Sequence, residues 1–132
     1  MRPDPVRYQW RAPFGDAEVE ALHAEAFGPA AGDWWARVNR HSLGWVCARA
    51  GGTLVGFVNV AWDGAAHAFI LDTVVARPLR RQGAGARLVE VAAAEARAAG
   101  CAWLHVDFED HLQDFYFGAC GFTPTHAGLI AL

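Results

Sequence analysis

Hydrophobic residues recur along the chain with two spacings: an alternation typical of strands, and steps of three and four typical of helices. The alternation predicts strands over 6–12, 45–49, 53–62, 67–75, 102–108 and 122–132. The longer steps predict helices over 16–27, 33–40 and 111–119, and a long alanine-rich helix that Gly100 closes. In the first helix, Val19, Leu22, His23 and Phe27 form one stripe. The predicted order is β-α-α-β-β-β-α-β-α-β, that of a mixed α/β protein.

The stretch from Phe69 to Ala99 holds the clearest sign of a binding site. It begins as an apolar, β-branched strand with one carboxylate, Asp72, and it ends as the long helix. Between the two lies the run RRQGAG over residues 80–85. Two glycines at a helix start let backbone amides approach an anion, and the helix dipole and the arginines add positive charge. The pattern predicts a cradle for a phosphate or pyrophosphate.

Two common nucleotide-binding motifs do not fit this run. A G-x-G-x-x-G fingerprint needs a third glycine, but Leu88 occupies its place, and six residues separate Val75 from Gln82. A P-loop needs Gly-Lys followed by Ser or Thr, which the chain lacks. A plain helix start without a ligand is the other interpretation.

Composition narrows the class of protein. With 132 residues, of which 54% are hydrophobic, the chain is expected to form a single domain over 1–132. It has no apolar run of about 18 residues and no apolar segment at its N-terminus, so we expect no membrane partner and a cytoplasmic location. Cys47, Cys101 and Cys120 are expected to be packed thiols. The net charge of −3 argues against a nucleic-acid partner.

Two motifs resemble those of the GNAT superfamily, the acyl-CoA-dependent N-acetyltransferases. The first is Arg80-x-x-Gly83-x-Gly85, which begins five residues after Val75. The second is the run FYFGACGF over 115–122, which resembles the family's aromatic helix start followed by Gly-Phe. The resemblance implies the GNAT fold: a twisted, mostly antiparallel sheet of six to seven strands with helices on both faces.

The resemblance also implies acetyl-CoA as co-substrate, with its pyrophosphate on the backbone of the loop that starts the long helix. The loop residues expected to bind it are Arg80, Arg81, Gln82, Gly83, Ala84, Gly85 and Ala86. The pantetheine arm is expected to pair with the main chain of Thr73, Val74 and Val75, where an amide would polarise the thioester carbonyl. The side chains of Val74 and Val75 are also expected to pack in the sheet, which is compatible with backbone binding.

Asp72 is the candidate general base. An alkylamine with a pKa of about 10.4 is mostly protonated at neutral pH, so acetyl transfer needs a group that takes its proton. A carboxylate in an apolar strand is costly unless it is solvated or paired. Acidic residues near this position resemble those of some GNAT amine acetyltransferases. The alternative is that Asp72 caps a bulge or pairs with an arginine.

Tyr116 is the candidate general acid. In the family this tyrosine stands four residues before the glycine of Gly-Phe, but here Phe117 holds that place and Tyr116 precedes it. Either a one-residue bulge brings Tyr116 to the thiol, or the tyrosine is absent and the thiolate leaves with the help of water. A core aromatic is the other interpretation of Tyr116.

Trp34, Asp107 and His111 are predicted to contact the acceptor, because an aromatic and acidic wall suits a cationic amine. For each of them, a core, solvated-loop or surface role is the alternative. Adjacent helical residues face different directions, so at most one of Trp34 and Trp35 is expected to point inward. No pair of histidines or cysteines has metal-ligand spacing, so no metal is expected.

The predicted function is acetyl-CoA-dependent N-acetylation of a primary amine on a small molecule, by direct transfer. Acetylation of a protein N-terminus or lysine, and a non-catalytic acyl-CoA-binding or sensing domain, are the alternatives. The apolar tail over 127–132 would allow a homodimer by joining a partner's sheet.

Overall fold

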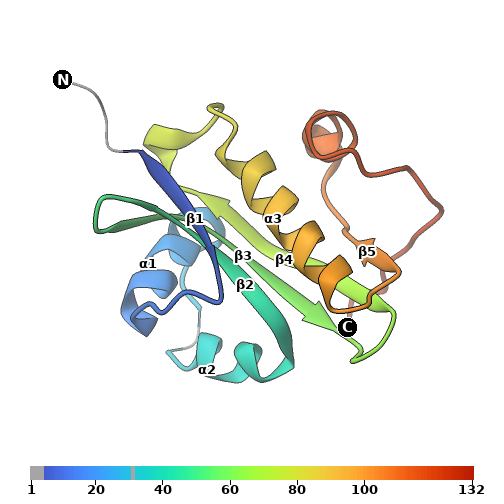
Figure 1. Ribbon diagram of the computed structural model, residues 1–132, viewed down its shortest axis with the longest axis horizontal. Coiled ribbons are helices and arrows are strands. Elements are labelled where there is room, and N and C mark those ends of the chain that lie inside the picture. The colour runs from blue at the N-terminus through green and yellow to red at the C-terminus, as the bar shows by residue number, and fades with distance from the viewer. Residues whose placement is uncertain (1–4, 31) are drawn as a thin grey trace.

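The computed structural model describes residues 5–30 and 32–132. Five strands and three α-helices follow one another along the chain (Figure 1). In order they are β1 (Val6–Trp10), α1 (Asp16–Phe27), α2 (Trp34–Val38), β2 (Ser42–Ala50), β3 (Thr53–Trp62), β4 (His67–Val75), α3 (Ala84–Ala98) and β5 (Trp103–His105). Short 3₁₀ turns cover Asn39–His41, Arg77–Leu79 and Asp110–Leu112, and a π-helical segment covers Asp114–Ala119.

The strands form one sheet in the order β1-β2-β3-β4-β5. The first four are antiparallel neighbours, and only β4 and β5 pair in parallel. A parallel pair needs a long crossover, which α3 supplies. The predicted fold class, a mostly antiparallel mixed sheet with helices on both faces, is confirmed.

Two hydrophobic clusters hold the helices to the sheet. The first lies under α3, where Leu88 meets Val58, Val60 and Ile70. The second joins α1 and α2 to the opposite face, with Val19, Leu22, Trp35, Phe57 and Val74 among its members (Figure 1). Val46, Phe57, Val58, Val60 and Leu88 are completely buried. The sheet is therefore the middle of three layers.

The strand predicted over 122–132 does not form, and the sheet has five strands instead of six to seven. Leu129, Ile130 and Leu132 are 80%, 87% and 118% exposed. Pro124 has no amide hydrogen to give to a ladder, and β5, the strand at this edge, is only three residues long. An apolar pattern alone does not make a strand, because a strand needs a partner for its backbone hydrogen bonds.

An ion pair ties the start of α1 to β2. The Arg49 guanidinium donates from Nη1 to Oε1 of Glu18 at 2.6 Å and from Nη2 to Oε2 at 2.8 Å. The Glu18 carboxylate also accepts the Gly15 amide at 3.3 Å, which caps the helix. The hydrogen bond from Arg49 holds the pKa of Glu18 below its usual value of 4.5, although partial burial opposes the shift.

Glu18→Gln should lower the free energy of unfolding at pH 7 by about 1 kcal/mol, because a partly exposed pair of good geometry is lost. Since the pKa of Glu18 is lowered by folding, this stabilisation is present above pH 4.5 and is lost as the pH falls through the lowered value. Urea unfolding of both proteins at pH 7 and near pH 3 measures the effect. An equal difference at the two pH values would contradict the prediction.

Candidate functional site

Strands β4 and β5 separate soon after they begin. They pair only over His67–Phe69 and Trp103–His105. Beyond Phe69, the part of the chain that the structure describes places no strand beside β4 on this side, so residues 70–75 present a free edge. An extended ligand can add to such an edge through backbone hydrogen bonds. This is the geometry expected for the pantetheine arm.

A bulge interrupts β4 in the middle of this free edge. Phe57 pairs with Val74 and Asn59 with Leu71, which leaves Val58 opposite both Asp72 and Thr73. Asp72 adopts a φ of +58°, a left-handed conformation that aspartate tolerates better than most residues. The alternative interpretation of Asp72 is a place at a bulge or a pair with an arginine, and the place at a bulge agrees with the structure.

The bulge also exchanges the faces of the strand. Ile70 belongs to the cluster under α3, whereas Val74, four residues later, belongs to the cluster under α1 and α2. In a regular strand these two side chains would share one face. The extra residue thus places Val74 in the core, as predicted for its side chain. Asp72 lies at the point where the strand changes faces.

Asp72 pairs with a histidine and not with an arginine. Its Oδ1 lies 3.0 Å from Nε2 of His23 on α1, and the two side chains are 25% and 9% exposed. The sequence pattern does not identify His23 as a site residue, because His23 occupies a buried position of the helical stripe. The signal that could have identified it is a polar ring in a stripe whose other side chains are apolar.

The loop before α3 has the open, turned backbone that an anion cradle needs. Gly83 has a φ of +84° and precedes the helix as its N-cap, and Arg81 has a φ of +63°. The Gln82 side chain closes the turn by donating to the Pro78 carbonyl at 2.9 Å. Arg87 donates its amide to the Gly83 carbonyl at 3.1 Å, so the amides of 84–86 lie before the first helical bond and stay free for a ligand.

The arginines around this loop differ in their surroundings. Arg80 donates from Nε to the Val75 carbonyl at 2.9 Å and lies 3.9 Å from a Glu25 oxygen. Arg87 pairs with Glu90 at 2.7 Å and lies over the Tyr8 ring. Arg81 is exposed at the turn. Arg80 therefore joins the end of β4 to the loop, and it already occupies the carbonyl of Val75, one of the predicted backbone partners.

Gly85 has a second role that its motif does not reveal. A Cβ at this position would lie 2.9 Å from Cζ of Phe115 and 3.8 Å from a Val75 methyl. The ring of Phe115 therefore rests directly on the backbone at the start of α3. Gly83, by contrast, has no atom within 4 Å of the corresponding position, so it borders open space.

The segment Asp114–Ala119 accommodates the displaced tyrosine by π-helical geometry. Cys120 donates its amide to Phe115, five residues earlier, at 2.9 Å. A π turn takes up one residue more than an α turn, and such turns are frequent at functional sites. The π turn supplies the one-residue bulge of the first alternative for Tyr116; the approach of Tyr116 to the thiol stays a prediction. The helix predicted over 111–119 is correspondingly split into a 3₁₀ turn and this π segment.

Tyr116 turns into the interior beside the bulge. It is 7% exposed and stacks on Phe108 with ring centroids 4.7 Å apart. Burial raises the pKa of its hydroxyl, and the nearby Thr73 hydroxyl offsets part of the shift. Among the described residues, Thr73 Oγ1 is buried without a well-formed hydrogen bond. The phenol is thus protonated at neutral pH, as a proton donor must be.

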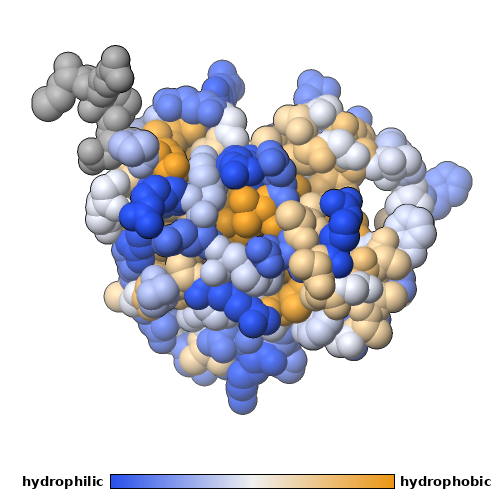
Figure 2. Space-filling view, viewed as in Figure 1, coloured by the Kyte–Doolittle hydropathy of each residue, from blue (hydrophilic) through white to orange (hydrophobic). Residues whose placement is uncertain are grey.

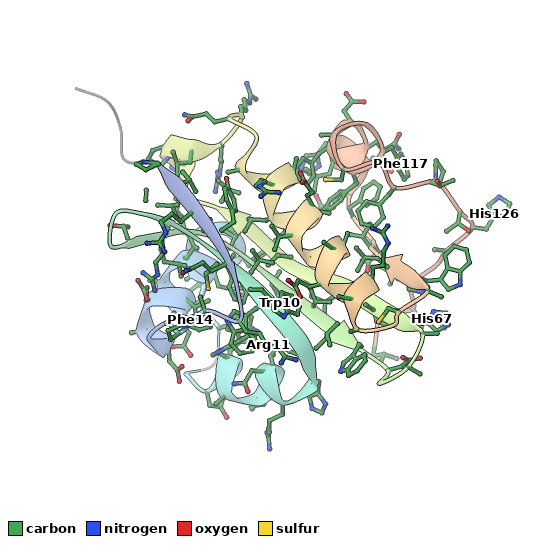
Figure 3. All side chains as sticks on the ribbon, in the orientation of Figure 1. Trp10, Arg11, Phe14, His67, Phe117 and His126 are labelled. Atoms are coloured by element: carbon green, nitrogen blue, oxygen red, sulfur yellow. The ribbon has the colours of Figure 1, made fainter. Side chains whose placement is uncertain are left out.

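Phe117, which holds the family's tyrosine position, packs edge-on against Phe108 at 5.1 Å. In Figure 3 it lies on the outer side of the segment, away from α3. Figure 2 shows the outline of the molecule indented between this segment and the turn before α3. Burial raises the pKa of the neighbouring Cys120 thiol to about 11, so this thiol is not poised to act as a nucleophile.

The predicted acceptor residues occupy separate places. Trp34 stacks on His23 with ring centroids 4.0 Å apart, while Trp35 is 4% exposed in the core, so one of the two tryptophans points fully inward as expected. Asp107 is exposed near enough to Tyr116 to influence its pKa. His111 is on the surface, 3.5 Å from a Glu109 oxygen. Contact of Trp34, Asp107 and His111 with an acceptor stays a prediction.

A surface depression of about 300 Å³ adjoins Trp34. Its other lining residues are Arg37, Val38, Arg40 and His41. The two arginines, Arg37 and Arg40, suit an anionic group better than an ammonium group. It is not lined by β4 or by the helix-start loop, so it is separate from the free edge.

Within residues 5–30 and 32–132, no three His, Cys, Asp or Glu side chains cluster closely enough to hold a metal ion. The same residues contain no helix with the length and hydropathy needed to cross a membrane. Cys47, Cys101 and Cys120 are free thiols.

Comparison with known proteins gives one family and many similar folds. A family model described as Acetyltransferase (GNAT) family matches residues 6–122. Among solved structures, a GNAT family acetyltransferase from Streptococcus pneumoniae is similar with a TM-score of 0.81 and 20% identity, over 97% of this chain and 98% of that one. Glucosamine-6-phosphate N-acetyltransferase from Arabidopsis thaliana has a TM-score of 0.77 and 13% identity, over 98% and 99%.

The aminoglycoside N-acetyltransferase AAC(6')-Iy, in a structure with CoA, is also similar. Its TM-score is 0.81 at 16% identity, with 99% of this chain and 96% of that chain covered. No curated protein matches the sequence. At these identities the solved structures establish the fold, while the family model establishes the family.

Gly85→Ala should lower the free energy of unfolding by about 1 kcal/mol, because the new methyl overlaps the Phe115 ring. Gly118→Ala is the matched control, since nothing lies within 4 Å of its Cβ position. Adding Phe115→Leu to Gly85→Ala should recover part of the loss. Urea midpoints of the four proteins measure this, and equal midpoints for Gly85→Ala and Gly118→Ala would refute the contact.

Proposed function

The chain belongs to the acetyltransferase (GNAT) family, and on that basis we propose that it transfers an acetyl group from acetyl-CoA directly to a primary amine of a small molecule. The observation that supports this most is the bulge of β4. The bulge lies on the free strand edge and contains Asp72 and Thr73, and the Thr73 hydroxyl lies close to the Tyr116 phenol. The loop that starts α3 lies at the end of the same strand.

The residues present fit coenzyme A. Gly83 leaves open space in front of the free amides of 84–86, which would hold the pyrophosphate together with Arg81. The free edge over 73–75 offers backbone groups to the pantetheine arm, with Arg80 holding the Val75 carbonyl. When bound, acetyl-CoA supplies the acetyl thioester.

Asp72 and Tyr116 would each transfer one of the protons that move in the reaction. Transfer forms a bond between the amine nitrogen and the acetyl carbon and breaks the carbon–sulfur bond. The carboxylate of Asp72 accepts the proton that the acceptor's ammonium group loses. The neutral amine then attacks, and its nitrogen loses a second proton, which leaves to water. The protonated phenol of Tyr116 donates to the departing sulfur and regains its proton from water, so that one proton is released in all; the raised pKa of the phenol keeps it protonated at neutral pH.

A small amine is proposed as acceptor because Trp34 packs against His23, the hydrogen-bond partner of Asp72, and so adds an aromatic ring to this group. Two similar structures are named as enzymes that acetylate an aminoglycoside and glucosamine 6-phosphate, which are small amine-bearing molecules. A homodimer and a cytoplasmic location stay predictions. The exposed apolar residues at 129–132 would be covered in such a dimer.

Asp72→Asn and Tyr116→Phe should each lower kcat about 10²-fold with acetyl-CoA and the best amine of a panel. Asparagine tolerates the φ of +58° and phenylalanine keeps the ring packing, so the fold is preserved. The panel should include small amines, a peptide with a free N-terminus and a lysine peptide. Preference for a peptide would contradict the small-molecule acceptor. Tight coenzyme A binding with background turnover in all three proteins would indicate a sensing domain.

Gly83→Glu should weaken coenzyme A binding by about 10-fold or more, because a carboxylate would stand in front of the free amides. Gly64→Glu is the matched control: Gly64 has a similar φ of +82°, is equally open, and lies in the turn at the opposite end of β4. Calorimetric titration with coenzyme A measures both. Equal affinities for the two variants would contradict the assignment of the loop.

A further inference from the structure

His23 is held in one orientation by two aromatic rings. Its imidazole packs at a tilt against Trp34 and Phe27, with ring centroids 4.0 Å and 4.7 Å away. The residue is 7% exposed on the face of α1 that meets β4. A ring packed in this way has little freedom to rotate, so its nitrogen atoms point in fixed directions.

The two ring nitrogens have opposite surroundings. Nε2 lies 3.0 Å from Oδ1 of Asp72, whereas Nδ1 is buried and has no hydrogen-bond partner among the described residues. A buried N–H without an acceptor is more costly than a bare nitrogen, because the donor loses its bond to water. The arrangement therefore places the proton of the neutral ring on Nε2, from which it is donated to the carboxylate.

This geometry excludes His23 as the group that receives the acceptor's proton. The nitrogen that carries a free lone pair, Nδ1, is enclosed, and the other nitrogen already serves Asp72. The Asp72 carboxylate remains 25% exposed and keeps its second oxygen for another partner. Asp72 and His23 thus differ in accessibility: the carboxylate of the base can be reached by an acceptor, and the free ring nitrogen of His23 cannot.

We propose that His23 is a positioning residue for Asp72: its Nε2–H holds Oδ1 so that the other carboxylate oxygen faces the acceptor amine at the bulge. This rests on the proposed function of Asp72 as general base. During transfer the ammonium proton passes to the free oxygen of Asp72, and His23 keeps its own proton. The left-handed backbone of Asp72 and the aromatic packing of His23 would then together fix the orientation of the Asp72 carboxylate.

Nuclear magnetic resonance of the ¹⁵N-labelled protein tests the pair without an activity assay. The His23 signals are assigned by their disappearance in His23→Gln. A proton on Nε2 and a bare Nδ1 in the neutral ring are expected. A bare Nε2 would overturn the proposal.

Kinetics separate positioning from mere packing. His23→Leu removes the donor and should lower kcat about 10-fold while the KM for acetyl-CoA stays within 2-fold. His23→Gln places an amide N–H near the position of Nε2 and should restore most of the kcat. Glu18→Gln is the control, because it breaks a different contact between α1 and the sheet and should leave kcat unchanged.

The outcomes distinguish this proposal from the one on which it rests. Equal losses in His23→Leu and His23→Gln, or wild-type kcat in His23→Leu, would overturn the positioning role, provided that Asp72→Asn has lost activity. Wild-type kcat in Asp72→Asn would instead refute Asp72 as the base. If His23→Leu does not fold, the kcat of His23→Gln and the tautomer of His23 still test the positioning role.

Discussion

One extra residue in β4 is the constraint around which the site is arranged. Because Val58 faces both Asp72 and Thr73, the strand changes faces between Ile70 and Val74. Ala68 and Ile70 before the bulge thereby pack under α3, whereas Val74 after it packs under α1 and α2. In a regular strand Val74 would share the α3 face with Ile70 and would not reach the cluster under α1 and α2.

The bulge is energetically unfavourable, and contacts from the surrounding structure compensate for it. Asp72 takes up a left-handed backbone, and its carboxylate would be poorly placed in an apolar strand without a partner. His23 supplies that partner from α1, and the rings of Phe27 and Trp34 pack against it. Strained backbone and buried polar pairs of this kind occur preferentially at functional sites.

Elements from distant parts of the sequence meet along the same edge of β4. The start of α3 follows the strand, Arg80 bonds to its last carbonyl, and Phe115 rests on Gly85. The π-helical turn then directs Tyr116 inward beside Thr73. The loop that starts α3, the open strand edge, Asp72 and Tyr116 are thus all positioned by β4 and the elements that follow it.

The sequence by itself determined the family, the fold class and the helix-start loop, because these depend on local patterns: the Arg80-x-x-Gly83-x-Gly85 spacing and the Phe69–Val75 strand. The sequence also revealed that Tyr116 is displaced by one residue. It did not reveal the π turn that accommodates this displacement, since only packing against Phe108 and β4 selects that turn. It overestimated the sheet, because the apolar tail after Pro124 finds no partner strand within this chain. Only the tertiary structure paired His23 with Asp72, which stand 49 residues apart. Contacts of that separation leave no periodic trace in a sequence, because they arise from how helices and strands pack and not from neighbouring residues.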